Sequence, residues 1–135
     1  MISHPARRGR AGRGLITVEM ALLLPILITL LFAIIEFGGI FFAKQNMSHA
    51  ARQAARGLAL GHLTGAEAET LVQTLLSDFG MTFTVVATVP GEGETDVSVF
   101  VSVPIAEASF GDAMGFFDGG ATVDVTVTMF KEDGS

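Results

Sequence analysis

The sequence predicts an α+β protein in which a long amino-terminal apolar helix is followed by a short helix and a small three-stranded antiparallel sheet. Three observations support this prediction. A long apolar stretch runs from Leu15 to Ala43 and is interrupted by only two charges, Glu19 and Glu36. Three later segments alternate apolar and polar residues with the period of two that is typical of half-buried strands. The chain after residue 60 is strongly acidic and therefore differs in character from the apolar stretch.

The apolar stretch is long enough to cross a bilayer as a helix. Sixteen residues from Met20 to Ile35 carry no charge, and seven more uncharged residues follow Glu36. A membrane helix needs about 20 predominantly apolar residues, so residues 15–42 are predicted to span the membrane. Basic residues are more numerous before the span (Arg7, Arg8, Arg10, Arg13) than after it (Lys44, Arg52, Arg56). This bias predicts a cytoplasmic amino terminus.

The helix is expected to continue beyond the membrane over residues 43–61. Apolar residues recur there at spacings of three and four, which is typical of a helix with one buried face: Ala43, Met47, Ala50, Ala51, Ala54 and Leu58. No helix breaker precedes Gly57 and Gly61. The prediction is one helix of 44 residues from Thr17 to Leu60, about 66 Å long at 1.5 Å per residue. The apolar face of its outer part must be buried against other residues of the protein.

Residues 62–135 are predicted to form a small acidic α+β domain that packs on this apolar face. Thr64 and Glu67 have the spacing of a capping box, and Gly80 is expected to end the short helix. One face of that helix is predicted to hold Leu71, Val72, Leu75, Leu76 and Phe79. The inward faces of the three strands are predicted to hold Phe83, Val85, Ala87 and Val89, then Val97, Val99, Val101 and Val103, then Val123, Val125, Val127 and Met129. The connection from Pro104 to Gly120, which includes Phe110, Met114, Phe116 and Phe117, is expected to hold a helical turn.

Charge and composition argue against several functions. After residue 60, twelve acidic residues accompany one basic residue, Lys131, so binding of nucleic acid by this part is not expected. The chain has no cysteine, and its three histidines lack the spacing of a zinc helix. The acidic turn at Glu92, Glu94 and Asp96 is interpreted as solvated rather than as a calcium site. We therefore expect no enzyme, no metal and no cofactor.

The spacing of Gly14, Leu15 and Glu19 suggests proteolytic processing. If a peptidase cut after Gly14, Leu15 would become the new terminus and Glu19 the fifth residue. The new ammonium group and the carboxylate could then neutralise each other between adjacent subunits, where the low dielectric strengthens their attraction. Alternatively, Glu19 is an interfacial acid favoured by the dipole at the start of a helix. Cleavage of an ordinary signal peptide, for which Ala43 is the plausible site, is disfavoured because the apolar stretch is too long.

The stretch RGLITVEMALLLPILITLLFAIIEFGGIFFAKQNMSHAARQAARGLA closely resembles the amino-terminal signature of the TadE-like family, the pseudopilins of the tight-adherence (Flp pilus) secretion machinery. Matching elements are Arg13-Gly14, Val18-Glu19, Pro25, Glu36-Phe37-Gly38 and the two Ala-Ala-Arg triplets ending at Arg52 and Arg56; the end of the chain, Val125 to Glu132, also looks like the last strand of the family. Two positions depart from the family pattern: Met20 stands where Tyr is frequent, and Gly39 where a basic residue is frequent.

The resemblance implies a pilin-like fold and a non-enzymatic pseudopilin in the bacterial inner membrane, with its carboxy-terminal domain in the periplasm or outside the cell. Residues 1–14 would be a leader arm removed by a prepilin-type peptidase. The implied partners are that peptidase, other pilin or pseudopilin subunits, inner-membrane pilus assembly proteins and the lipid bilayer. Glu19, Pro25 and Glu36 are the candidate assembly residues. Glu36 either pairs with a basic group of a neighbour or, as we favour, marks the end of the embedded part. The alternative function is an unprocessed, single-pass envelope binding protein.

Overall fold

The structure is a computed structural model that describes residues 11–91, 95–109 and 120–131, with side chains from Gly14 onward. The chain divides into two compact units, Met1–Ile35 and Glu36–Ser135. Most of the predicted leader arm, the turn residues Glu92 and Glu94, and the part of the Pro104–Gly120 connection that holds Phe110, Met114, Phe116 and Phe117 lie outside the described residues.

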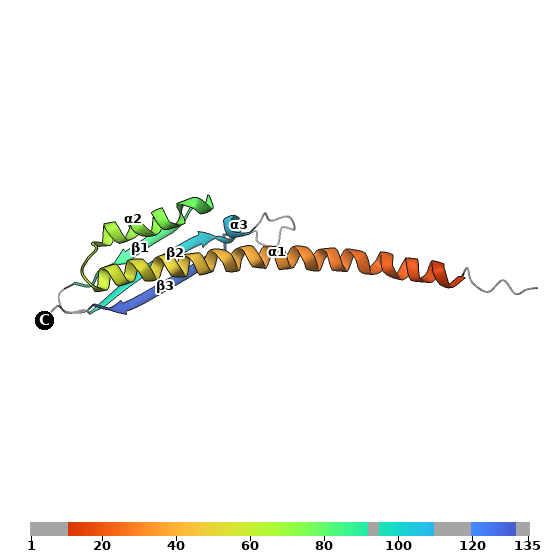
Figure 1. Ribbon diagram of the computed structural model, residues 1–135, viewed down its shortest axis with the longest axis horizontal. Helices are drawn as coiled ribbons and strands as arrows, with labels where there is room; N and C mark the ends of the chain where they lie inside the picture. The colour runs from red at the N-terminus through yellow and green to blue at the C-terminus, as the bar shows by residue number, and fades with distance from the viewer. Residues whose placement is uncertain (1–10, 92–94, 110–119, 132–135) are drawn as a thin grey trace, which may run out of the picture. The chain divides into compact units, whose positions relative to one another are not determined.

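Helix α1 extends from Ala11 to Ala59 and continues through Pro25 (Figure 1). It therefore begins six residues before the predicted Thr17. Extension of an existing helix costs little once its nucleus has formed, and no proline separates residue 11 from residue 17. The hydroxyl of Thr29 donates a hydrogen bond of 2.8 Å to the carbonyl oxygen of Pro25, one turn earlier.

The part of α1 in the first unit is apolar and exposed. A helix over Gly14–Ala59 is long and apolar enough to cross a membrane, and the mean hydropathy of its most apolar window is 2.6. No residue of that window is buried within the protein. A helix that is apolar on all sides is stable either inside a protein core or in a bilayer. Because the described residues of the protein leave this part of α1 exposed, a bilayer is the environment that fits it.

The second unit contains an antiparallel sheet in the order β1-β2-β3, formed by Thr84–Thr88, Asp96–Pro104 and Thr122–Phe130. The register pairs Val85 with Val101 and Val101 with Val125, so valines from neighbouring strands align on one face. Four alternate residues of β2 on that face are fully buried: Val97, Val99, Val101 and Val103. The three predicted strands and their inward faces are thus largely confirmed. Val89 is the exception, because it lies after the end of β1 and is 46% exposed.

Helix α2 (Gly65–Leu76) begins at the predicted capping box, and the 3-10 helix η1 (Ser77–Phe79) ends at Gly80, whose φ is 64°. The buried positions of α2 are Ala68, Val72 and Leu76, four residues apart. Leu75 is 40% exposed, so its predicted place in the core is wrong. A row with four-residue spacing makes only a narrow contact on a helix, and Leu75 lies to one side of it.

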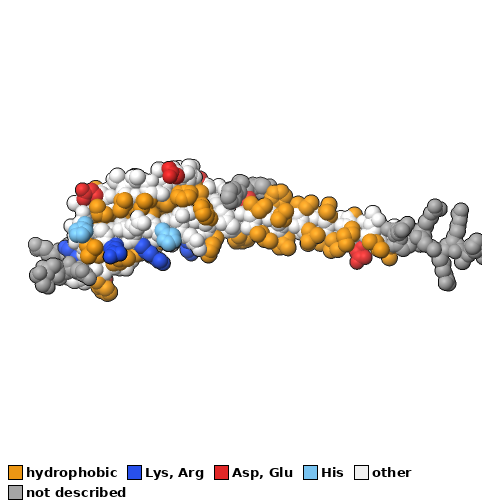
Figure 2. Space-filling model, viewed as in Figure 1, with side chains coloured by type: hydrophobic (Ala, Val, Ile, Leu, Met, Phe, Trp, Pro, Cys, Tyr) orange, Lys and Arg blue, Asp and Glu red, His pale blue; other side chains and the backbone are white. Residues whose placement is uncertain are grey.

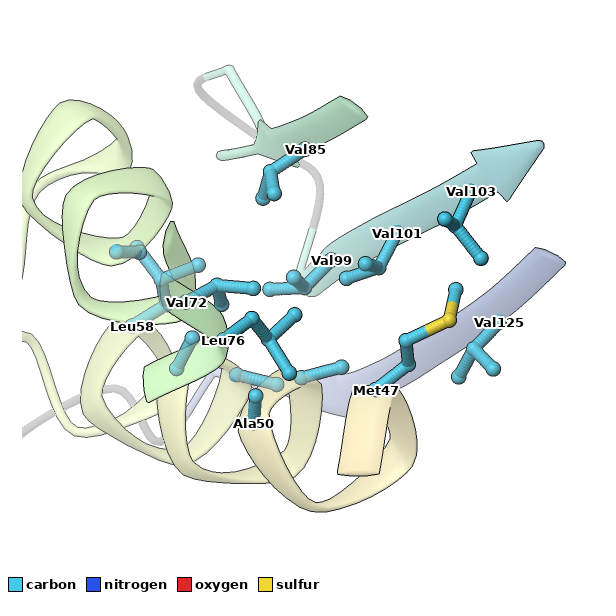
Figure 3. Close-up of a cluster of buried hydrophobic side chains, with 14 of the residues drawn as sticks. Met47, Ala50, Leu58, Val72, Leu76, Val85, Val99, Val101, Val103 and Val125 are labelled. Atoms are coloured by element: carbon cyan, nitrogen blue, oxygen red, sulfur yellow. The ribbon is translucent and has the colours of Figure 1, made fainter. Parts of the chain in front are cut away.

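The core of the second unit lies between the sheet, α2 and the outer part of α1 (Figure 3). Met47 and Leu58 of α1 are buried with Val72 and Leu76 of α2 against the valines of the sheet. Six alanines of α1 are also buried, namely Ala43, Ala50, Ala51, Ala54, Ala55 and Ala59. Small side chains allow the helix backbone to approach its neighbours closely. The predicted helical turn after β2 is present as α3 (Ile105–Ala108).

Candidate functional site

The residues of the predicted processing site lie on α1 in the first unit. Gly14 and Leu15 are exposed, and a Cβ atom added at Gly14 would meet nothing within 4 Å. Glu19 follows Leu15 by four residues, which is one turn of helix, and its side chain is exposed. The structure thus places the two positions on the same side of the helix, with open space around them.

Pro25 borders a shallow apolar groove in the first unit. The groove is lined by Pro25, Ile26, Thr29, Leu30 and Ala33. Pro25, Thr29 and Ala33 are four positions apart and have compact side chains, which is the arrangement that lets a second helix pack closely in a bilayer. The sequence prediction did not include Thr29, although its spacing from Pro25 was visible.

Glu36 is the first residue of the second unit and is half-buried. Its Oε2 atom is fully buried, and no described residue donates a hydrogen bond to it. Gly39 and Ala43, which follow it at spacings of three and seven on the same face of α1, are buried. A buried polar atom without a partner costs about 1 to 3 kcal/mol. The burial of this carboxylate was not foreseen, because nothing local to Glu36 distinguishes it from a solvated acid.

A second cavity lies beside this face of α1. It has a volume of ≈ 380 Å³ and is lined by α1 (Gly39, Phe42), by η1 and the residues after it (Asp78, Phe79, Met81), and by α3 and the residue after it (Glu107, Ala108, Ser109). The rings of Phe42 and Phe79 meet edge to face, with centroids 5.7 Å apart. Oε2 of Glu107 accepts a hydrogen bond from the backbone N–H of Thr82, which fixes the carboxylate at the cavity. Asp78 is exposed. The cavity therefore combines apolar walls with two acidic groups.

This acidic cavity could not be predicted from sequence patterns. Its lining residues come from three segments that are far apart in the chain. The only local signal is the pair Gly38-Gly39, which opens space within a run of bulky residues.

Basic side chains gather along a different edge of the second unit, as Figure 2 shows. Lys44, Arg52 and Arg56 lie on the outer face of α1 and are exposed. Among the residues that the structure describes, no ion pair joins these cations to an acid of the same chain. The acidic side chains occupy other parts of the same surface (Figure 2). The two charged surfaces therefore do not neutralise each other within one molecule.

Metal-binding geometry is absent from the described part of the chain. Within residues 11–91, 95–109 and 120–131, no group of three His, Cys, Asp or Glu side chains could hold a metal ion. His49 and His62 are both exposed. The features on which a function can be built are therefore the exposed helix, its carboxylates and the two charged surfaces.

The fold defines a class of protein in which one candidate membrane helix carries a small α+β domain. Within this class, the model of the family described as TadE-like protein matches residues 14–56. The match covers the predicted span, residues 15–42, and most of the outer part of α1, and it confirms the resemblance predicted for this segment. It indicates a component associated with the tight-adherence (Flp) pilus. No similar protein was found among curated sequences, and none among solved structures.

Proposed function

We propose that this chain is a minor pseudopilin, a non-enzymatic subunit that is anchored in the bacterial inner membrane and acts in the assembly of a tight-adherence pilus. The observation that carries the proposal is the TadE-like apolar helix, whose most apolar window is exposed, with an acid, Glu19, one turn after Leu15. The amino terminus lies in the cytoplasm before processing, and the acidic domain faces the periplasm.

The role of Glu19 in this proposal follows from electrostatics. A prepilin-type peptidase cuts after Gly14 and releases a new ammonium group at Leu15. Both this group and the Glu19 carboxylate are costly at the edge of the hydrocarbon region. Pairing the carboxylate of one subunit with the ammonium group of the next removes both costs and sets the axial register of the two helices.

The rest of the first unit supplies the packing surface. Its large apolar side chains are exposed, Leu24 and Leu31 to 59% and 57%, and can contact lipid or neighbouring helices. The groove at Pro25, Thr29 and Ala33 offers a place of close approach. Glu36 adds a buried oxygen that a donor from another subunit would satisfy. These features support a subunit that bundles with others.

Processing is tested by amino-terminal sequencing of the protein purified from its native host. We expect Leu15 as the first residue. Functional protein that retains an intact arm would refute cleavage after Gly14.

The role of Glu19 is tested by Glu19→Ala, with surface piliation and adherence as measurements. We expect piliation to be lost while the domain remains folded. The matched control is Asp124→Ala, which removes an exposed carboxylate from the sheet domain and should leave piliation intact. Normal piliation of Glu19→Ala would remove the electrostatic basis of the proposal.

A second candidate function is an unprocessed, membrane-anchored binding protein. It is favoured by the finding that the second unit has its own hydrophobic core, so the domain needs no neighbour to bury its apolar face. Carbonate extraction followed by co-purification separates the two candidates. A protein that stays in the membrane and never travels with pilus components would be the anchored binder.

A further inference from the structure

We propose that the acidic cavity formed by α1, η1 and α3 receives the side chain of Lys44 from a second copy of this chain. The inference rests on the proposed function, because it requires parallel subunits whose helices lie side by side. It goes further by naming the contact between their extramembrane domains.

The chemistry of the cavity suits a lysine side chain. Phe42, Phe79 and Met81 provide apolar walls, and Asp78 and Glu107 provide negative charge. Lysine buries its aliphatic stem on apolar surface while its ammonium group stays with polar partners. The ammonium group is also attracted to the faces of aromatic rings. A neutral apolar side chain would leave the carboxylates of Asp78 and Glu107 without a positively charged partner.

Lys44 cannot fill the cavity of its own chain. At 3.6 residues per turn, it lies about 140° around α1 from Gly39 and about 160° from Phe42, the two helix residues that line the cavity. Lys44 is exposed, and no described residue of its own chain forms an ion pair with it. Its charge is therefore available to a neighbour.

The register expected from the proposed function brings the two groups to the same level. Pairing of the Leu15 ammonium group of one copy with Glu19 of the next requires an offset of four residues between parallel α1 helices. Because α1 is one continuous helix, the same offset brings Lys44 of one copy level along the axis with position 40 of the other, between Gly39 and Phe42 of the cavity wall. By contrast, Arg52 and Arg56 would lie beside positions 48 and 52, which do not line the cavity. The offset thus selects Lys44 among the three cations.

Such a contact uses different surfaces on the two copies. A heterologous contact of this kind repeats from copy to copy and produces an open assembly rather than a closed dimer. This property matches a subunit that adds to a growing end.

Zero-length crosslinking with a carbodiimide tests the contact directly, because the reagent joins an amine to a carboxylate that touches it. The full chain would be crosslinked in native membranes that contain a mixture of isotopically light and heavy copies, and the linked peptides identified by mass spectrometry. We expect a light–heavy link from Lys44 to Asp78 or Glu107. The sequence has only one other lysine, Lys131, so the assignment is unambiguous. The absence of any Lys44 link between copies, or a link confined to one copy, overturns the proposal.

Charge reversal provides a second measurement with matched controls. In membranes with two differently tagged copies, Lys44→Glu in both should lower co-purification of the tags about tenfold. Adding Asp78→Lys to these copies should restore co-purification. Lys44→Arg keeps the charge but lacks the reactive amine, so it should retain co-purification and lose the crosslink. Arg56→Glu should have no comparable effect, and equal losses for Lys44→Glu and Arg56→Glu would contradict the contact.

The outcomes also separate this inference from the proposed function. A chain that begins at Leu15 and supports piliation but gives no Lys44 link retains the function and loses the contact. A chain with an intact arm that still gives the link retains the contact and loses the proposed processing.

Discussion

The two parts of α1 bury apolar side chains to opposite degrees within the protein. In the first unit, large side chains such as Leu22 and Ile26 are 68% and 64% exposed. In the second unit, Ala51 and Met47 of the same helix are completely buried. The apolar character of a single residue therefore does not tell whether it faces lipid or its own domain.

The size and the distribution of the side chains separate the two parts. The first part carries leucine, isoleucine and phenylalanine on all sides, which suits a fluid apolar solvent that adapts to any shape. The outer part places alanines on one face and Lys44, Arg52 and Arg56 on another. Small residues are needed there because a protein core is closely packed and does not adapt. The side chains of the outer part of α1 are therefore determined by close packing in the domain. Those of the part in the first unit are determined by the apolar solvent around it.

The largest expected effect comes from truncating the same residue type in both parts. Met47 is fully buried, so Met47→Ala should destabilise the domain by about 2 to 5 kcal/mol through lost contacts and a cavity. Met20 is 60% exposed, so Met20→Ala should change stability by less than about 0.5 kcal/mol. Thermal unfolding of the full chain in detergent, followed by far-UV circular dichroism, measures both. Equal effects of the two substitutions would remove the distinction between the parts of α1.

A smaller effect is expected at two glycines of α1, with opposite signs. A Cβ atom at Gly57 would clash with Cδ1 and Cγ of Leu63, whereas one at Gly38 would meet nothing within 4 Å. Gly38→Ala should stabilise the helix by up to about 1 kcal/mol through higher helix propensity. Gly57→Ala should be destabilising by about 1 kcal/mol, because the clash outweighs the same gain. The same thermal measurement applies, and stabilisation by Gly57→Ala would show that Leu63 moves aside at little cost.

Features with a local period could be predicted from the sequence. The long helix, the capping box at Thr64 and the three strands each depend on residues that are close in the chain, and the structure confirms them. The errors are also local in origin. Leu75 has the spacing of a core residue, but α2 contacts the core through a narrower row than the pattern indicated.

The candidate site could be predicted only in part. Glu19 and Pro25 could be identified as candidates from the sequence, because a charge and a proline are unusual in a membrane span. The buried oxygen of Glu36 and the cavity at Asp78 and Glu107 were not visible. The cavity depends on three segments that meet only after folding, and no pattern in the sequence indicates which segments those are.

The smallest expected effect concerns two glutamates, one in each unit. The backbone N–H of Thr64 donates a 2.8 Å hydrogen bond to Glu67, and the Thr64 hydroxyl donates another of 2.9 Å. The backbone bond, and then the side-chain bond, lower the pKa of Glu67 below its ordinary value of 4.5. Because the folded pKa is the lower one, the stabilisation is complete above pH 4.5 and is lost as the pH falls through the folded value.

Glu67→Gln should therefore remove part of the fall in melting temperature between about pH 6 and about pH 3. The matched control is Glu19→Gln, which removes a carboxylate from the exposed part of α1. It should leave the pH dependence of domain unfolding unchanged, since Glu19 makes no contribution to the core of the second unit. If Glu19→Gln flattened the profile as much as Glu67→Gln, the stability of the domain would depend on the apolar half of the helix, and the two parts of α1 would not be energetically separate.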